Sequence, residues 1–402
     1  MEKELTAIDL FAGAGGLSEG LREAGFHGLY ANELIPTYAQ TYAINHPDTI
    51  VDSRDIREVD AAEVRERLGL RAGELDLLAG GPPCQGFSIN APKRSADDKR
   101  NHLFREFLRF VEEFNPRAVL IENVPGLVSF AGGETLQAIL ESLRLLGYAA
   151  DVQILYAPHY GVPQTRWRTI VIGLRDGTKP LEAFPSAQRV APMRINFTSK
   201  FDGRAIVALP RTVELPPHTT LSEAISDLPV LTNGETGEIE KSYRTSPQNS
   251  YQQALRAGSD SVRNHEAPKL STLNMERLSY IPAGGNWTDI PFHLLPKGMQ
   301  AARRSDHTKR YGRVAPDGLA STILTKCDPH WGAYFHYSQD RAFSVREAAR
   351  IQSFPDSFTF TGSKVDQYEQ VGNAVPPLLA AAVGQSISAQ LGVKHDSLER
   401  AI

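Results

Sequence analysis

The chain has few cysteines and no long apolar run, and each scarcity excludes a class of protein. Its 402 residues include two cysteines, Cys84 and Cys327, which are too few for a disulfide framework. We therefore expect a reducing compartment and a cytoplasmic protein. No run of about 18 apolar residues occurs, so no membrane span is predicted. The first residues, MEKELTAIDLF, lack the basic and apolar regions of a secretory signal.

The chain also lacks a large excess of charge of either sign. The formal net charge is −4, which argues against a protein coated for nucleic acid, and 41% hydrophobic residues are typical of a soluble globular chain. One stretch departs from this average. The segment 297–313, KGMQAARRSDHTKRYGR, holds six Lys or Arg and one Asp. Such a segment is either a solvated face or a phosphate-binding surface, and charge alone favours the first.

Apolar runs and helical periods alternate over the first 175 residues. This alternation predicts an α/β fold with a doubly wound, mostly parallel sheet. The strand candidates are, in order, LTAIDLFAG, GLYANE, a third strand position just before Asp55, ELDLLAGG, PRAVLIENV, AADVQILYA and RTIVIGL.

Composition then changes, and this change sets the predicted domain boundaries. Residues 1–185 form the large domain. Residues 186–362 are rich in Pro, Gly, Ser and Thr and predict a smaller, irregular, β-rich domain. Residues 363–402, with the apolar helix PPLLAAAVGQSISAQL, are expected to return to the large domain.

A glycine-rich turn, DLFAGAGG at 9–16, stands where the first strand meets the first helix. Gly13, Gly15 and Gly16 allow a ligand to approach the backbone closely. Glu33 ends the second strand, where it suits a ribose diol, and Asp55 follows the third and suits an adenine amino group. The turn lacks the third glycine of the dinucleotide fingerprint, so S-adenosylmethionine is favoured over NAD.

Cys84 lies in GGPPCQGFS, a rigid turn after the fourth strand. By itself the turn is equally compatible with a structural thiol and with a displayed nucleophile. Glu122 ends the fifth strand. Since the carboxyl ends of parallel strands meet at one edge of a sheet, both residues are expected beside the glycine-rich turn.

Six motifs occur in an order that resembles the DNA cytosine-5 methyltransferase family. They are DLFAGAGG, PPCQGFS, ENVPG, QTRWR, SVREAARIQSFPDSF and QVGNAVPP. The resemblance covers the large domain and the C-terminus, whereas residues 186–310 carry no motif. It implies the methyltransferase fold, S-adenosylmethionine as methyl donor, and no metal.

The resemblance also implies catalytic roles. The Cys84 thiolate would add to carbon 6 of cytosine, which makes carbon 5 nucleophilic. Glu122 would donate a proton to N3 of the base. Arg168 would contact the base carbonyl, and Arg166 a phosphate or the catalytic loop. A base inside a duplex is unreachable, so the target must be flipped out.

Binding residues are implied in the same way. The resemblance places the cofactor against Phe11, Gly13, Gly15, Gly16, Leu17, Glu33, Asp55, Ile56, Pro82, Asn373 and Val375. The middle segment corresponds to a target-recognition domain, which favours a DNA-contact role for the basic segment. The predicted DNA contacts are Gln85 and Ser88 beside the nucleophile, and Arg303, Arg304, Lys309, Arg310 and Arg313.

The interpretation is a DNA cytosine-5 methyltransferase that acts as a monomer on double-stranded DNA. By family expectation it protects host DNA from a partner restriction endonuclease that it does not physically bind. Two alternatives stay open: an RNA cytosine-5 methyltransferase of the same lineage, and a catalytically silent DNA-binding module. Methylation of tRNA against plasmid separates the first, and a Cys84→Ala variant with unchanged activity would favour the second. The missing dinucleotide fingerprint excludes an NAD-linked dehydrogenase.

Overall fold

The computed structural model describes residues 4–82, 103–176, 179–210, 214–237 and 239–392. It divides into two compact units. Unit 1 comprises Met1–Gly161, Trp167–Pro217 and Val375–Leu398, and unit 2 comprises Val162–Arg166, His218–Ala374 and Glu399–Ile402. Among the described helices, none is both long and apolar enough to cross a membrane.

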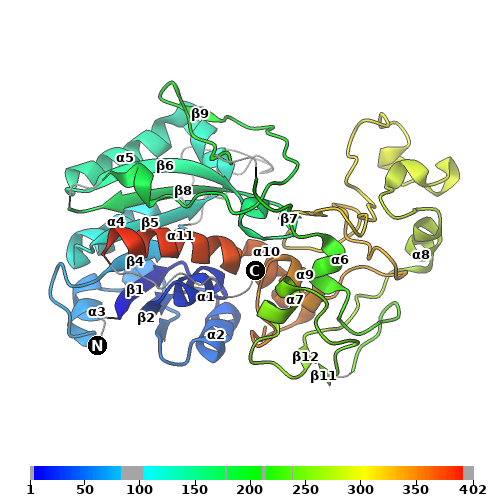
Figure 1. The fold of residues 1–402 in the computed structure, drawn as a ribbon, viewed down its shortest axis with the longest axis horizontal. Coiled ribbons are helices and arrows are strands. Elements are labelled where there is room, and N and C mark those ends of the chain that lie inside the picture. The colour runs from blue at the N-terminus through cyan, green and yellow to red at the C-terminus, as the bar shows by residue number, and fades with distance from the viewer. Residues whose placement is uncertain (1–3, 83–102, 177–178, 211–213, 238, 393–402) are drawn as a thin grey trace. The chain divides into compact units, whose positions relative to one another are not determined.

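Unit 1 is built on a seven-stranded sheet (Figure 1). In sheet order the strands are β3 (Ile50–Asp52), β2 (Phe26–Asn32), β1 (Leu5–Leu10), β4 (Leu77–Gly80), β5 (Ala118–Asn123), β8 (Trp167–Leu174) and β6 (Ala149–Tyr156). The first five run parallel, whereas β8 is antiparallel to both β5 and β6. The predicted mostly parallel α/β sheet is confirmed.

Helices cover this sheet because their apolar faces are buried against it. They are α1 (Gly16–Glu23), α2 (Pro36–Asn45), α3 (Ala61–Arg67), α4 (Leu103–Phe114), α5 (Glu134–Leu145) and α11 (Pro377–Gln390). In α4 the apolar residues recur at helical spacing, and Phe107, Phe110 and Phe114 are fully buried. Helix α11, red in Figure 1, packs beside α1. A two-stranded ribbon, β9 (Lys200–Phe201) with β10 (Arg204–Ala205), completes unit 1.

The carboxyl ends of β1, β2, β4 and β5 meet at one edge of the sheet. Leu10 pairs with Asn32 on one side and with Gly80 on the other, and Gly80 pairs with Ile121. The residues that follow these strand ends therefore converge, which is the arrangement that open α/β sheets use to bind ligands.

Unit 2 consists of short elements joined by long loops. Its helices are α6 (Leu221–Ile225), α7 (Ser250–Leu255), α8 (Thr272–Ser279), α9 (Val345–Ile351) and α10 (Lys364–Asn373). Its strands have two residues each: β7 (Gln164–Thr165) pairs with β13 (Ala320–Ser321), and β11 (Glu240–Lys241) with β12 (Val262–Arg263). The expected β-rich character is thus limited to these short pairs among the described residues.

Candidate active site

The glycine-rich turn follows β1 and is held by Glu33. The Glu33 carboxylate accepts a 2.8 Å hydrogen bond from the Gly13 amide and another of 2.8 Å from the Ile35 amide. Gly15 adopts φ 100° directly before α1, and a Cβ there would lie 2.8 Å from His46 Nε2. Glycine is therefore required for this turn. The structure thus brings the Glu33 carboxylate to the glycine-rich turn, whereas its predicted contact with a ribose stays a prediction.

Asp9 is a buried carboxyl that the motif analysis did not single out. It lies at the end of β1, is 3% exposed, and accepts a 2.7 Å hydrogen bond from Ser18 Oγ, which in turn accepts one of 2.8 Å from the Tyr42 hydroxyl. Its other oxygen, Oδ1, is buried with no hydrogen-bond partner among the described residues. Burial, and then the nearby Glu33 and Glu122 carboxylates, raise the pKa of Asp9 to about 7.

Replacing Asp9 with asparagine is expected to change how stability depends on pH. The unfolded carboxyl ionises near pH 4, whereas the folded one ionises near about 7, so the wild-type fold loses stability as pH rises through this window. Asparagine carries no such proton and still accepts from Ser18. As pH rises from 4 to 7, the free energy of unfolding of Asp9→Asn should increase relative to that of wild type by on the order of a few kcal/mol. Above about pH 7 this difference should stay constant. Urea unfolding at several pH values measures the difference; a constant difference over the whole range would contradict the expectation.

Glu122 and Arg168 form an ion pair at the same edge. Arg168 Nε contacts Glu122 Oε1, and their side chains are 10% and 12% exposed. The pair forms because β8 runs antiparallel to β5, with Glu122 opposite Ile170 and Asn123 opposite Thr169. Burial lowers the pKa of Arg168, and the Glu122 carboxylate opposes this effect.

Glu122 also adjoins the start of the PPCQ segment. A Cβ added to Gly81 would lie 3.1 Å from Glu122 Oε2. The next residue, Pro82, is buried and its carbonyl accepts a 3.2 Å hydrogen bond from Asn123 Nδ2. Cys84, Gln85 and Ser88 lie outside the described residues. The described chain thus brings the carboxyl group of Glu122 to the point where the cysteine segment begins.

The other predicted cofactor residues of unit 1 are placed as follows. Phe11 adopts φ 59° and packs partly against the core, while Gly16, Leu17, Ile56 and Val375 are buried. Asp55 caps the helical turn Ile56–Glu58 and pairs with Arg57 through both carboxylate oxygens. The Arg57 guanidinium holds the pKa of Asp55 down to about 2. Asp55 is therefore an acceptor that already has a cationic partner.

Arg166 and Asn373 belong to unit 2. Arg166 is 2% exposed, and its guanidinium donates hydrogen bonds to the carbonyls of Ile323, Gly372 and Ala374 at 2.8–3.0 Å. Two of these carbonyls flank Asn373, which is exposed at the end of α10. Arg166 therefore holds the GNAV turn in position, an arrangement that no local sequence pattern shows.

The basic segment divides into two kinds of cation. Arg303, Arg304 and Lys309 are exposed, although the Lys309 ammonium also donates a 3.3 Å hydrogen bond to Thr165 Oγ1. Arg313 instead donates to the carbonyls of Ile281, His336 and Gln339 and pairs with Asp340. The guanidinium of Arg313 thus ties together loops of unit 2, so it differs from its exposed neighbours.

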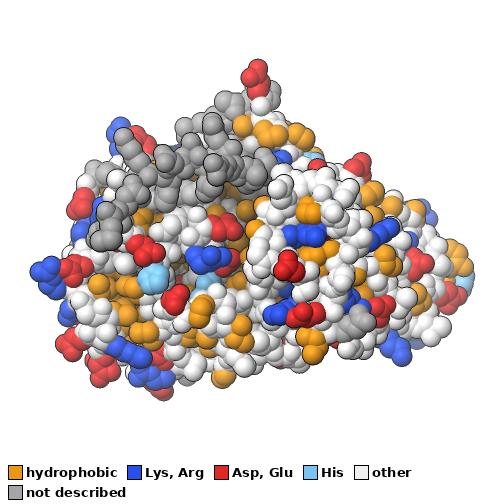
Figure 2. All heavy atoms as spheres, turned by 60° about the horizontal axis from the view of Figure 1, so that its bottom comes forward, with side chains coloured by type: hydrophobic (Ala, Val, Ile, Leu, Met, Phe, Trp, Pro, Cys, Tyr) orange, Lys and Arg blue, Asp and Glu red, His pale blue; other side chains and the backbone are white. Residues whose placement is uncertain are grey.

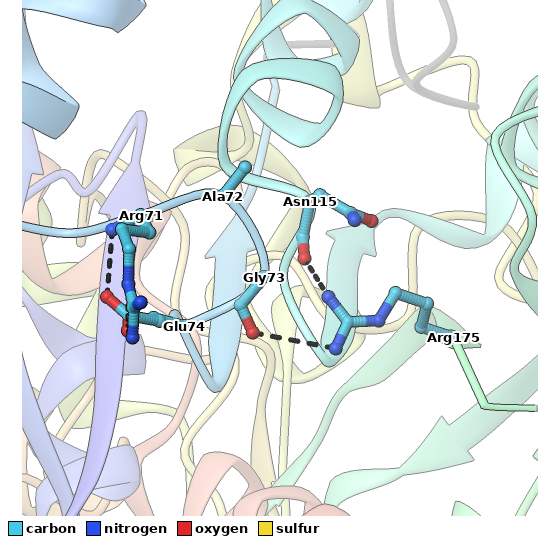
Figure 3. Close-up of a pocket in the computed structure, with 6 residues that line it drawn as sticks. All are labelled: Arg71, Ala72, Gly73, Glu74, Asn115 and Arg175. Carbon is cyan, nitrogen blue, oxygen red and sulfur yellow. Dashed lines mark hydrogen bonds and ion pairs between the residues drawn. The ribbon is translucent and has the colours of Figure 1, made fainter.

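A hollow of about 470 Å³ lies at the other edge of the sheet (Figure 3). Arg71–Glu74 precede β4, Asn115 precedes β5 and Arg175 follows β8, so the hollow is at the amino ends of the parallel strands. It shares no residue with the candidate active site. Among the residues that the structure describes, no cluster of His, Cys, Asp and Glu could hold a metal ion.

Comparisons with known proteins agree with the motif order. The family model described as C-5 cytosine-specific DNA methylase matches residues 5–389. The Type II methyltransferase M.AgeI of Thalassovita gelatinovora is 36% identical, covering 95% of this chain and 99% of that protein. M1.HphI of Haemophilus parahaemolyticus is also 36% identical, over 95% of this chain and 86% of its own length. A prophage-encoded putative DNA modification methyltransferase from E. coli shares the fold, with a TM-score of 0.70 and 24% identity, over 97% of this chain and all of its own.

Proposed function

Because this chain belongs to the C-5 cytosine-specific DNA methylase family, we propose that it methylates carbon 5 of a flipped-out cytosine in a specific duplex DNA sequence. The methyl donor is S-adenosylmethionine and the nucleophile is Cys84. One observation carries the proposal: the Glu122–Arg168 ion pair stands beside Gly81, where the cysteine segment begins, at the sheet edge that holds the glycine-rich turn.

The residues at this edge fit the proposed donor. S-adenosylmethionine carries a positively charged sulfonium and an ammonium group. The carboxylates of Glu33 and Glu122 lie close enough to Asp9 to raise its pKa, so a cation beside these three groups is electrostatically favourable. The buried, unpartnered Oδ1 of Asp9 is a further acceptor. Glu33, Phe11 and the glycine-rich turn would hold the adenosyl part.

The chain's own groups supply the steps that activate the base. The Cys84 thiolate adds to carbon 6, and the ring electrons shift towards N3, where Glu122 donates a proton. Arg168 holds the Glu122 carboxyl and is placed to contact the base carbonyl. When bound, S-adenosylmethionine supplies an electrophilic methyl group to carbon 5. Loss of the carbon 5 proton to water, departure of the Cys84 thiolate and return of the N3 proton to Glu122 then restore the neutral ring and the enzyme.

We assign target recognition to residues 186–362, most of which lie in unit 2. The exposed cations Arg303, Arg304 and Lys309 suit phosphate contacts. Arg166 acts by positioning the turn that carries Asn373, which with Val375 completes the donor site, and the C-terminal segment 363–402 serves this site. Gln85 and Ser88 contact DNA beside the nucleophile. We propose that the enzyme acts as a monomer and that it protects DNA from a restriction endonuclease; the similarity to Type II methyltransferases supports only a link to restriction-modification.

Covalent trapping tests the proposal. Bisulfite sequencing of DNA from an expressing host first defines the methylated motif. A duplex oligonucleotide with 5-fluorocytosine at that position is then incubated with enzyme and S-adenosylmethionine. Fluorine cannot leave as a proton does, so a denaturant-resistant adduct should form, and peptide mapping should place it at Cys84. Cys84→Ser is the matched control and should give no adduct. An adduct elsewhere, or none with wild type, would overturn the mechanism.

A further inference from the structure

An arginine in unit 2 lies over an exposed tryptophan. The guanidinium carbon of Arg310 is 4.9 Å from the centroid of the Trp331 ring. Trp331 is 56% exposed, although burying an indole is among the more favourable changes available to a fold. An exposed tryptophan that already carries an arginine on its face is typical of a binding surface.

Backbone contacts hold the two side chains together. The Tyr311 amide donates to the Pro329 carbonyl at 2.6 Å, and the Phe335 amide to the Gly312 carbonyl at 3.1 Å. A Cβ on Gly312 would lie 2.5 Å from Ala333 Cβ, so glycine allows the two segments to lie this close. Tyr311, the residue after Arg310, is 3% exposed and its ring packs edge-on against His330, the residue before Trp331. The position of Arg310 over Trp331 is therefore built into the fold of unit 2.

The donors of Arg310 are open. Arg310 is half-buried and its guanidinium lies over the Trp331 ring, but among the described residues the guanidinium has neither a hydrogen-bond acceptor nor an ion-pair partner. By contrast, the guanidinium of Arg313, three residues further on, donates hydrogen bonds to backbone carbonyls and pairs with Asp340. An arginine that is stacked on one face keeps its planar N–H edge available and loses little entropy when it binds.

Charge alone does not single out this site. Figure 2 shows a face on which acidic and basic side chains are interspersed, and the whole chain carries a net charge of −4. A phosphate contact would need only a positive charge, which the exposed Arg303 and Arg304 already provide. Arg310 differs from those two arginines because its guanidinium lies over an aromatic ring, which restricts the positions that it can take.

Resting on the proposed function, we propose that Arg310 reads a guanine in the target duplex, with Trp331 as its positioning residue. The guanidinium edge matches O6 and N7 of guanine in the major groove, and this bidentate contact distinguishes guanine from the other bases. Trp331 keeps the guanidinium in the plane that the contact requires. Arg310 is thus a specificity-determining residue.

Site preference tests this assignment. The full-length protein is assayed on a duplex oligonucleotide that holds the motif found by bisulfite sequencing, and on duplexes with single base-pair changes. Arg310→Ala and Arg310→Lys should both lose discrimination at one G·C pair, by about 5- to 150-fold in kcat/KM, with preferences elsewhere retained. Trp331→Ala should weaken preference at that same pair, and Trp331→Phe should restore part of it.

Arg304→Ala is the matched control. This variant should weaken binding to every sequence alike, with unchanged base preference. The slope of the logarithm of the binding constant against the logarithm of the salt concentration should fall by about the amount expected for one phosphate contact. If wild type methylates its motif but Arg310→Lys keeps every preference, then Arg310 is a phosphate contact or a bystander and the assignment falls while the proposed function stands. If wild type methylates no cytosine, the proposed function itself fails. Thermal denaturation checks that each variant is folded.

Discussion

Replacing Glu122 with glutamine is expected to lower kcat by about 10²- to 10⁴-fold, the range for loss of a general acid. Glutamine has almost the same shape but no acidic proton to give to N3 of the base. It also removes the ionic partner of Arg168, whose side chain is 10% exposed. The rate of methylation in a single turnover, at saturating duplex and S-adenosylmethionine, measures the effect on the chemical step.

Two comparisons make this expectation specific. Glu113→Gln breaks another Arg–Glu pair of unit 1, with Arg65 at 2.7 Å, which is more exposed and away from the candidate site, and should leave kcat unchanged. Formation of the 5-fluorocytosine adduct by Glu122→Gln should be slowed together with turnover, because proton donation accompanies addition of the thiolate. Turnover within about threefold of wild type would mean that Glu122 is not the proton donor.

Most of unit 1 could be predicted from sequence because parallel strands that are buried on both faces read as continuous apolar runs. PRAVLIENV is such a run and forms β5, and the equally apolar run RTIVIGL forms β8 in the same sheet. Strand direction was less accessible. β8 runs antiparallel because β6 is followed by a connection too short for a crossover helix, which the apolar runs themselves do not reveal. Unit 2 has few periodic segments, so only its irregular character could be predicted.

Site residues that stand at the end of a strand could be placed from the sequence. A residue whose role depends on contacts with backbone groups far away in the sequence could not. Glu33 and Glu122 end strands and could be placed at one edge. Asp9 was missed because an aspartate inside the apolar run TAIDLF reads as one more strand residue. The contacts of Arg166 with carbonyls 157 and 206 residues away depend on tertiary structure alone.

Replacing Glu347 with glutamine is expected to destabilise unit 2 by about 3–5 kcal/mol, the cost of breaking a buried ion pair from one side. Glu347 is 1% exposed and accepts hydrogen bonds from both Nη atoms of Arg341, at 2.6 and 2.7 Å. It also caps α9 by accepting from the Ser344 amide at 2.8 Å. Glutamine would leave the buried Arg341 without a counter-ion. The shift of the unit 2 transition in urea measures the loss.

A second capping box, at the start of α6, provides the control. Glu223 caps α6 in the same way but is solvent-exposed and, among the residues that the structure describes, pairs with no arginine, so Glu223→Gln should cost about 1 kcal/mol or less. Replacing both Arg341 and Glu347 with methionine should recover part of the lost stability, because no unpaired charge remains.

Arg341 holds the pKa of Glu347 well below its usual range. The stability from this carboxylate is therefore present above about pH 4 and is lost as pH falls further, so the gap between wild type and Glu347→Gln should narrow in acid. A gap that widens in acid would show that the charge of Glu347 is not what stabilises unit 2.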